Sequence, residues 1–268
     1  MSRPIVVKIG GSALEQAGSE LWSTIAKASA TWPLVVVHGG GETANARLAA
    51  HGFASDRVGG LRLTPPEHVG IVAGALSGEV NTRVVAALNA AGAKAVGLTL
   101  VDAGSVECEN AGLAPGDRVG RVSTLRDDSL FIALRASKLL PVVSSIGADS
   151  EGLLNINADD AAEGLAIGLN ASKLVYLTDV DGVFDQDGRA IGHIETEEID
   201  GLVTSGVISG GMEAKVRAAA RAAERMTGWV TISSWRHAWS LSATLSESGM
   251  SGGTRIAASS APAMGGDA

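Results

Sequence analysis

Two short apolar runs that each end in a cluster of glycines constrain the fold of this sequence most. Ile5–Ile9 stops at Gly10 and Gly11, and Leu34–Val37 stops at His38, which three further glycines follow. Runs rich in β-branched residues that break at glycine predict strands feeding tight loops. Two such strands predict a mostly parallel sheet with a polyanion bound across the edge where the strands end.

Lys8 is the one cation inside the first run. It has two readings. In the first, the run is an edge strand, and the lysine stem packs along apolar surface while its ammonium group reaches water. In the second, the ammonium group serves the predicted anion. The run by itself does not decide between them.

Composition excludes several classes of partner. The chain has 268 residues, of which 46% are hydrophobic, enough for a sizeable core. A formal charge of −8 and only 3% aromatic residues argue against a nucleic-acid or anionic-membrane partner. Cys108 is the only cysteine, so no internal disulfide and no cysteine-based zinc cluster can form, and we interpret it as an inert apolar residue. No signal peptide or spanning helix is recognised, which predicts a cytoplasmic protein.

Strand-like and helix-like segments alternate along the chain, which predicts an α/β sandwich. Further strands are expected at 95–100, 139–144, 173–178, 229–232 and 254–256. Helices are expected at 20–30, 43–50, 66–75, 77–91, 130–137, 158–169, 197–203 and 212–226. The segment 101–121, rich in Gly, Asp and Ala, is interpreted as a loop or hairpin excursion. The composition of 258–268 predicts a disordered tail.

The stretch from Gly39 to Ala44 formally contains G-x-G-x-x-A between a strand and a helix, a weak form of the dinucleotide fingerprint. That fingerprint requires an acidic residue at the end of a second strand about 20 residues later, where this chain has Arg57–Gly60. A dehydrogenase therefore stays a distant alternative. No G-x-x-x-x-G-K-[ST], no G-x-S-x-G and no metal-binding histidine spacing occurs in the sequence.

Polar residues exceed structural need at two predicted helix starts. Asn155, Asn157, Asp159 and Asp160 precede or open one helix, although a single capping residue would suffice. Lys215 lies near the start of another helix, where the helix dipole disfavours a cation unless an anion is bound at Ser209-Gly210-Gly211.

Six of these segments together resemble the amino acid kinase family. They are Lys8–Gly11, Val37–Gly41, Gly60–Arg62, Asn155–Asp159, Leu177–Val183 and Gly210–Val216, in the family's order, with further likeness at 233–237 and 253–256. The resemblance implies a three-layer αβα sandwich around a mainly parallel open sheet, in two lobes. Residues 1–172 would bind the acceptor and dimerise, and residues 173–257 would bind ATP.

Within the family, the resemblance is to the short members that phosphorylate the side-chain carboxylate of N-acetyl-L-glutamate, the second step of arginine biosynthesis. It implies ATP with Mg²⁺ held mainly by the nucleotide phosphates, and a product N-acetyl-L-glutamyl 5-phosphate. Because the first strand begins at residue 5, we expect no extra N-terminal helix, hence a homodimer that arginine does not inhibit. Whether a PII-type regulator binds is left open.

The resemblance also implies roles for individual residues. Lys8 and Lys215 would stabilise the transferring phosphoryl group from opposite lobes, and Asp159 would orient both lysines. The acceptor would contact Gly40, Gly41, Arg62 and Asn155. The nucleotide would contact Gly10, Gly11, Asp179, Val180, Asp181, Gly182, Val183, Phe184, Val207, Ile208, Ser209, Gly210 and Gly211.

Two kinds of alternative remain: another acceptor within the family, and a function without catalysis. The acceptor could instead be aminoadipate (free or carrier-linked), aspartate, glutamate, carbamate or UMP. A nucleotide-binding module without turnover would be expected to lack Lys8, Asp159 or Lys215, and all three are present.

Overall fold

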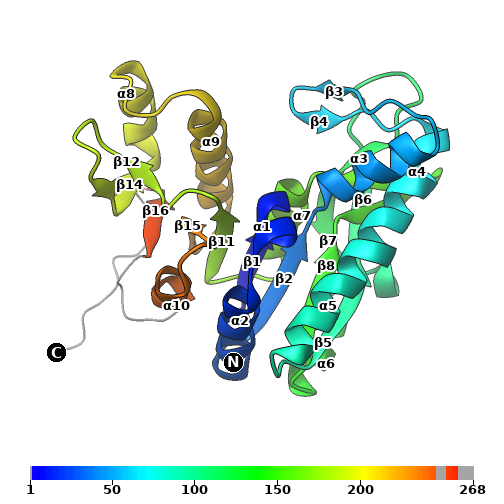
Figure 1. Cartoon of the computed structure of the whole chain (residues 1–268), viewed down its shortest axis with the longest axis horizontal. Helices are drawn as coiled ribbons and strands as arrows, with labels where there is room; N and C mark the ends of the chain where they lie inside the picture. Colours follow the sequence, from blue (N-terminus) through cyan, green and yellow to red (C-terminus); the bar gives the residue numbers. More distant parts are fainter. Residues whose placement is uncertain (1, 246–251, 259–268) are drawn as a thin grey trace.

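A computed structural model describes residues 2–245 and 252–258, organised around one eight-stranded sheet (Figure 1). In sheet order the strands are β14 (His193–Glu195), β16 (Gly253–Ala257), β15 (Trp229–Ser234), β11 (Lys173–Thr178), β1 (Ile5–Ile9), β2 (Leu34–His38), β8 (Leu140–Ser144) and β5 (Ala95–Thr99). Every neighbouring pair is parallel except β15–β16. The predicted mainly parallel sheet is confirmed.

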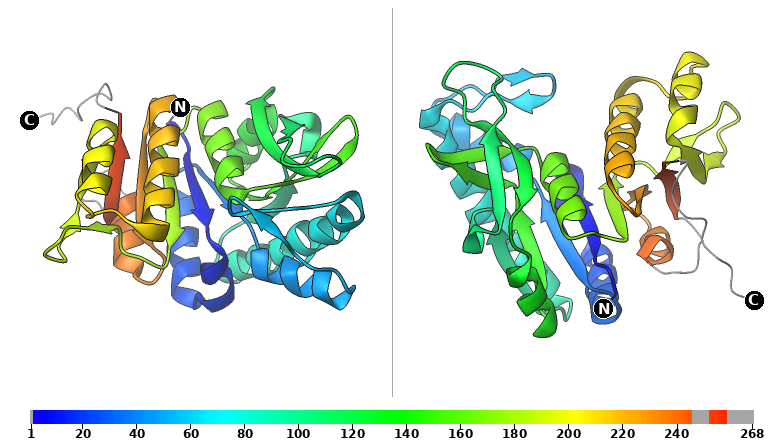
Figure 2. Two further views of the ribbon diagram at one scale, coloured as in Figure 1. Left: turned by 90° about the horizontal axis from the view of Figure 1, so that it is seen from above. Right: turned by 180° about the vertical axis from the view of Figure 1, so that it is seen from behind.

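Helices cover both faces of this sheet, which gives the expected three-layer sandwich (Figure 2). One face packs against α2 (Ser19–Thr31), α5 (Asn81–Ala90) and α10 (Ala238–Leu245). The other packs against α6 (Ser129–Ala136), α7 (Ala158–Gly168) and α9 (Gly210–Arg225). Smaller helices are α1 (Gly11–Gln16), α3 (Gly41–Ala50), α4 (Pro66–Ala73), α8 (Ile199–Thr204), the π-helical η1 (Gly74–Val80) and the 3₁₀ turns η2 (Asp102–Gly104) and η3 (Thr196–Glu198).

A second sheet lies against the α7 side of the core. Its order is β6 (Val106–Asn110), β7 (Val119–Leu125), β10 (Gly152–Ile156) and β9 (Ile146–Asp149). The expected excursion at 101–121 is thus an antiparallel hairpin, extended to residue 125 and paired with β10. Cys108 is buried within it, and this burial raises the pKa of its thiol to about 11, as expected for an inert apolar residue.

The alternation of side chains along β1 places Lys8 on the α7 face of the sheet. Ile5, Val7 and Ile9 pack in the cluster on the α2 face, whereas Val6 packs in the cluster that contains α7. Lys8 has the same parity as Val6, so it shares that face. Because β1 is paired on both sides, the edge-strand reading of Lys8 is wrong.

The segment Pro66–Ala90, formed by α4, η1 and α5, is long and apolar enough to cross a membrane by length and composition alone. Within it, Val80, Val84 and Leu88 are buried against the central sheet. That packing is the arrangement of a core helix. Of the predicted disordered tail, all but Ala258 lies outside the described residues.

Candidate functional site

A cleft of about 230 Å³ opens where β1 and β2 end. Its lining includes Lys8, Gly11, Gly40, Gly41, Arg62 and Asn155, so six of the residues predicted from sequence lie around one space. Arg57 adds a third cation, and among the described lining residues there is no Asp or Glu. A chain with a net charge of −8 therefore has a cleft lined by positive charge, which fits an anionic ligand.

Three helices begin at this cleft. Gly11, Gly41 and Ala158 are the first residues of α1, α3 and α7, and all three line it. Backbone N–H groups at a helix N-terminus lack partners within the helix, and the helix dipole makes that end favourable for negative charge. The glycine loops after β1 and β2 are thus the starts of helices that meet at one anion site.

Gly40 and His38 fix the backbone of the second glycine loop. Gly40 has φ +148°, and a Cβ there would come within 2.8 Å of Leu76 and Val80, so only glycine fits. His38 is buried, which lowers its pKa to about 4 and keeps it neutral. Asn81 donates to its Nε2 at 2.9 Å, so the proton is on Nδ1, which donates to the carbonyl of Gly39 at 2.7 Å. The N–H of Gly40, opposite that carbonyl in a trans peptide, must then point away from His38.

Lys8 and Asp159 form an ion pair of 2.8 Å between β1 and α7. Capping of α7 is done by Asn157, whose side chain accepts from the backbone N–H of Asp159. One residue therefore meets the structural need, and the carboxylate of Asp159 is left to hold Lys8 at the mouth of the cleft. Asp159 is thus a polar residue beyond those that capping of α7 requires, as the sequence suggested.

Arg62 is buried with neutral partners only. Its guanidinium donates to the carbonyl of Gly41 at 2.8 Å and to the side chains of Asn45 and Ser55. Burial, followed by the charge of Arg57, lowers the pKa of Arg62, while Glu42 raises it. A buried cation without a paired carboxylate is costly, and an anion bound in the cleft would relieve that cost.

Thr64 ties Arg62 to Asn155. Its hydroxyl donates to the carbonyl of Arg62 at 2.9 Å, so its remaining role is to accept, and the side-chain amide nitrogen of Asn155 donates to it at 2.9 Å. The orientation of the Asn155 amide is therefore fixed by Thr64, which is completely buried. Thr64 in turn receives the backbone N–H of Arg118 and donates its own N–H to Asp117.

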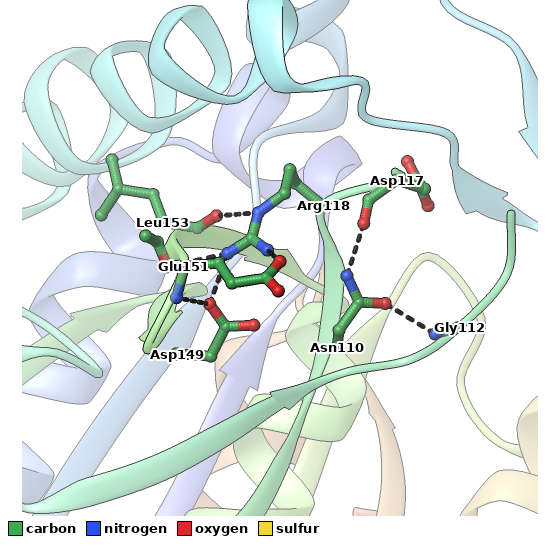
Figure 3. A network of polar contacts seen from close by, with 8 residues as sticks. Asn110, Gly112, Asp117, Arg118, Asp149, Glu151 and Leu153 are labelled. Carbon is green, nitrogen blue, oxygen red and sulfur yellow. Dashed lines mark hydrogen bonds and ion pairs between the residues drawn. The ribbon is translucent and has the colours of Figure 1, made fainter. Parts of the chain in front are cut away.

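Arg118 anchors this arrangement to the second sheet (Figure 3). It contacts Asp149 at 2.6 Å, Glu151 at 3.1 Å and the carbonyls of Gly152 and Leu153. Hydrogen bonding to Arg118 lowers the pKa of Asp149. Arg118 thereby contacts residues on both sides of the turn between β9 and β10, and β10 is the strand that carries Asn155.

The predicted nucleotide residues gather at the end of β11 and the start of α9. Lys215 pairs with Asp179 at 3.5 Å, whereas Asp159 pairs with Lys8, so in this structure Asp159 does not join the two lysines. Gly182 has φ +133° and lies against Thr254, whose hydroxyl accepts from the backbone N–H of Val183. The residues 179–184 and 207–210 are not among the described lining residues of the 230 Å³ cleft, and Gly10 lies next to Lys8, which lines it.

The start of α9 differs from the sequence prediction. We expected the helix to begin at Met212, which would place Lys215 in its first turn. The helix begins at Gly210, so Lys215 lies in the second turn. The helix dipole acts mainly within the first turn, so the electrostatic argument for a misplaced Lys215 is weakened, and its pairing with Asp179 becomes the stronger observation.

Sequence reasoning missed three residues of the site. Arg57 carries a signal, because it closely precedes Gly59 and Gly60, the two glycines of a tight turn. His38 and Thr64 give no local signal, since the contacts that give them a role, from Asn81 to His38 and from Asn155 to Thr64, join residues far apart in the chain. A larger groove of about 1,110 Å³ between α2, α5 and α10 contains none of the predicted residues.

Asp160, next to the site, gives a prediction on stability. Burial, with the charges of Glu163 and Asp159, raises its pKa to about 6 from 3.8. Between pH 4 and 6 the folded state therefore binds more protons than the unfolded state, and this residue's contribution to stability falls as the pH rises. We expect Asp160→Asn to raise the free energy of unfolding at pH 8 by about 2 kcal/mol, and to have little effect below pH 4. Urea denaturation at both pH values measures this, with the exposed Asp56→Asn as the control for loss of a charge. An equal effect at both pH values would contradict it.

Comparison with known proteins assigns the family. The model of the "Amino acid kinase family" matches residues 3–232, most of the chain. The chain belongs to this family, and the resemblance read from the six segments is confirmed.

Within this family, the chain is similar to proteins named acetylglutamate kinase. The acetylglutamate kinase of Colwellia psychrerythraea is 41% identical over 237 residues, which cover 87% of this chain and 90% of that protein. The acetylglutamate kinase of Moritella profunda is 40% identical over 243 residues, with 88% and 90% covered. Among solved structures, the smu.665 protein of Streptococcus mutans UA159 superposes with a TM-score of 0.78 at 28% identity, covering 96% of this chain and all of that one.

Proposed function

We propose that this protein transfers the γ-phosphoryl group of ATP to the side-chain carboxylate of N-acetyl-L-glutamate, in the second step of arginine biosynthesis. The observation that carries the proposal is the cleft itself, with three cations, three helix N-termini and no carboxylate in its described lining. Similarity to relatives named acetylglutamate kinase supports the choice of acceptor.

The reaction needs charge stabilisation rather than a general base. The acceptor carboxylate is already ionised at neutral pH, so the task is to bring two anions together and to stabilise the transferring group. Lys8 and Lys215 supply positive charge to that group, and Asp159 keeps Lys8 in place. The amides of Gly10, Gly11, Gly40 and Gly41 are suited to the phosphoryl and acceptor oxygens.

The acceptor extends from Lys8, which lies beside Gly10, to Arg62, which lies beside Gly41. Arg62 binds its α-carboxylate with a planar, bidentate guanidinium, and Asn155 binds the same molecule through the amide that Thr64 orients. Two carboxylates on one acceptor then meet two separate groups of cations. This match favours an acceptor with two carboxylates over carbamate, which has one.

The nucleotide is held by residues 179–184 and 207–211, in the lobe 173–257, and the acceptor by the lobe 1–172. The described residues contain no group of three or more His, Cys, Asp or Glu side chains that could hold a metal ion. Mg²⁺ would be carried on the phosphates of ATP, where it neutralises developing charge. A cytoplasmic homodimer without arginine inhibition completes the proposal.

The experiment that tests the proposal is ADP release from MgATP with a panel of acceptors. The panel contains N-acetyl-L-glutamate, aminoadipate and its N-blocked form, aspartate, glutamate, carbamate and UMP. We expect turnover with N-acetyl-L-glutamate to exceed the others by at least about tenfold. Activity confined to another acceptor would overturn the substrate, and ATP binding without any turnover would leave a binding module.

Arg62→Ala tests the acceptor end of the cleft. We expect the KM for N-acetyl-L-glutamate to rise about 100-fold, because a charge-assisted, bidentate contact is lost, with kcat changed much less. Steady-state kinetics with each substrate varied in turn measures the two constants. An equal rise in the KM for ATP would show instead that the substitution disturbs the whole site.

A further inference from the structure

Arg57 lies directly opposite Arg62 in a short hairpin at the cleft. The hairpin consists of β3 (Arg57–Val58) and β4 (Leu61–Arg62), and the register pairs Arg57 with Arg62. Gly59 and Gly60 both have positive φ, as a two-residue turn between such strands requires. The turn therefore fixes two like charges across from each other.

The two guanidinium groups converge on one point. A Cβ built on Gly41 would lie 3.4 Å from Nη2 of Arg57 and 3.7 Å from Nη2 of Arg62. Each side chain bonds only neutral groups in the described structure: Arg57 donates to the carbonyl of Gly60 at 2.9 Å, and Arg62 has the neutral partners given above. No described carboxylate forms an ion pair with either.

Such a pair is unfavourable without a ligand. Like charges directly opposite in an antiparallel pair destabilise it, and the charge of Arg57 contributes to the lowered pKa of Arg62. A carboxylate bound between them would convert this repulsion into two charge-assisted contacts. Arg57 is exposed, so its side chain has room to adjust to such a ligand.

We propose that Arg57 is a second binding residue for the α-carboxylate of the acceptor, and that the Arg57–Arg62 pair selects acceptors in which this carboxylate is free. The proposal rests on the proposed function, since it names a contact with the same acceptor. It assigns to the hairpin a specificity for the non-reacting end of the molecule, whereas Lys8 serves the reacting end.

The test combines a protein variant with a substrate variant. Arg57→Gln removes the charge but keeps a donor for the carbonyl of Gly60, and Arg57→Lys keeps the charge. We expect Arg57→Gln to raise the KM for N-acetyl-L-glutamate about tenfold, with the KM for ATP within about twofold of wild type, and Arg57→Lys to recover most of the loss. With the α-amide of N-acetyl-L-glutamate, which lacks the α-carboxylate, the effect of Arg57→Gln should shrink to less than about twofold.

Stability without substrate gives an independent readout. Since the pair is repulsive when empty, Arg57→Gln should leave the Tm unchanged or raise it, and should reduce the shift in Tm that the acceptor produces. A lower Tm for Arg57→Gln, together with a KM that is near wild type in Arg57→Gln and raised in Arg57→Lys, would assign Arg57 a structural role. Equal effects of Arg57→Gln on the acid and the amide would also overturn the proposal. If the wild-type protein does not use N-acetyl-L-glutamate, the proposed function fails first, and the same Tm shifts are measured with the acceptor that it does use.

Discussion

Replacing Lys8 by alanine is expected to lower kcat by about 100- to 1,000-fold, with the KM for either substrate changed by much less. Lys8 points to the α7 face of an interior strand and is held by Asp159 at 2.8 Å. Its side chain is 17% exposed, so its charge acts in a partly desolvated place, where electrostatic stabilisation is stronger than in water. A group that stabilises charge developing only in the transition state affects kcat more than KM.

Two further variants make the Lys8 result specific. Lys8→Met keeps an apolar stem packed in the strand and should lose as much activity as Lys8→Ala, because the charge is what matters. Lys94→Ala removes an exposed lysine elsewhere and should keep wild-type kinetics. Steady-state ADP release measures all three, and near-normal turnover by both Lys8 variants would remove Lys8 from the chemistry.

Lys215→Ala is expected to lower kcat by a similar factor of about 100 or more, again with smaller effects on KM. Lys215 and Asp179 are each about half exposed, and their 3.5 Å pair is therefore weak. Little free energy is needed to move the ammonium group from Asp179 to a transferring phosphoryl group. The pair holds Lys215 beside the predicted nucleotide residues.

The matched control for Lys215 lies on the same helix. Arg225→Ala removes a cation from the last turn of α9, where Arg225 pairs with Glu163. We expect it to leave kcat unchanged, with a loss of stability because Glu163, whose side chain is 14% exposed, loses its ion partner. Equal losses of kcat in the two variants would mean that the charge of the helix as a whole matters, and that Lys215 has no place in the reaction.

Much of the architecture could be read from local patterns. The β-branched runs at 5–9 and 34–37 are strands β1 and β2, and the glycines that follow begin α1 and α3. The family, and with it the three-layer fold, followed from six short segments in order, and is confirmed by the matched family model. The roles of the individual site residues, the two lobes and the lack of arginine inhibition stay predictions.

Other features could not be predicted, for physical reasons that differ. The six-residue helix α1 is too short for a periodic signal, and its stability comes from tertiary packing, since Ala13 is buried in the cluster on the α2 face of the sheet. The sequence left 101–121 open between a loop and a hairpin, because the hairpin depends on pairing with β10, which follows about 30 residues later.

The sequence by itself determined which segments become strands, where the glycine loops break them, and that Lys8, Arg62, Asn155, Asp159 and Lys215 are available for the chemistry. These are local properties, set by propensity and side-chain period. The tertiary structure alone decided that β1 is interior, that Asp159 takes Lys8 while Asp179 takes Lys215, and that Arg57 faces Arg62. Such contacts join residues far apart in the chain or on opposite strands, and their geometry depends on register and packing, which no single segment encodes.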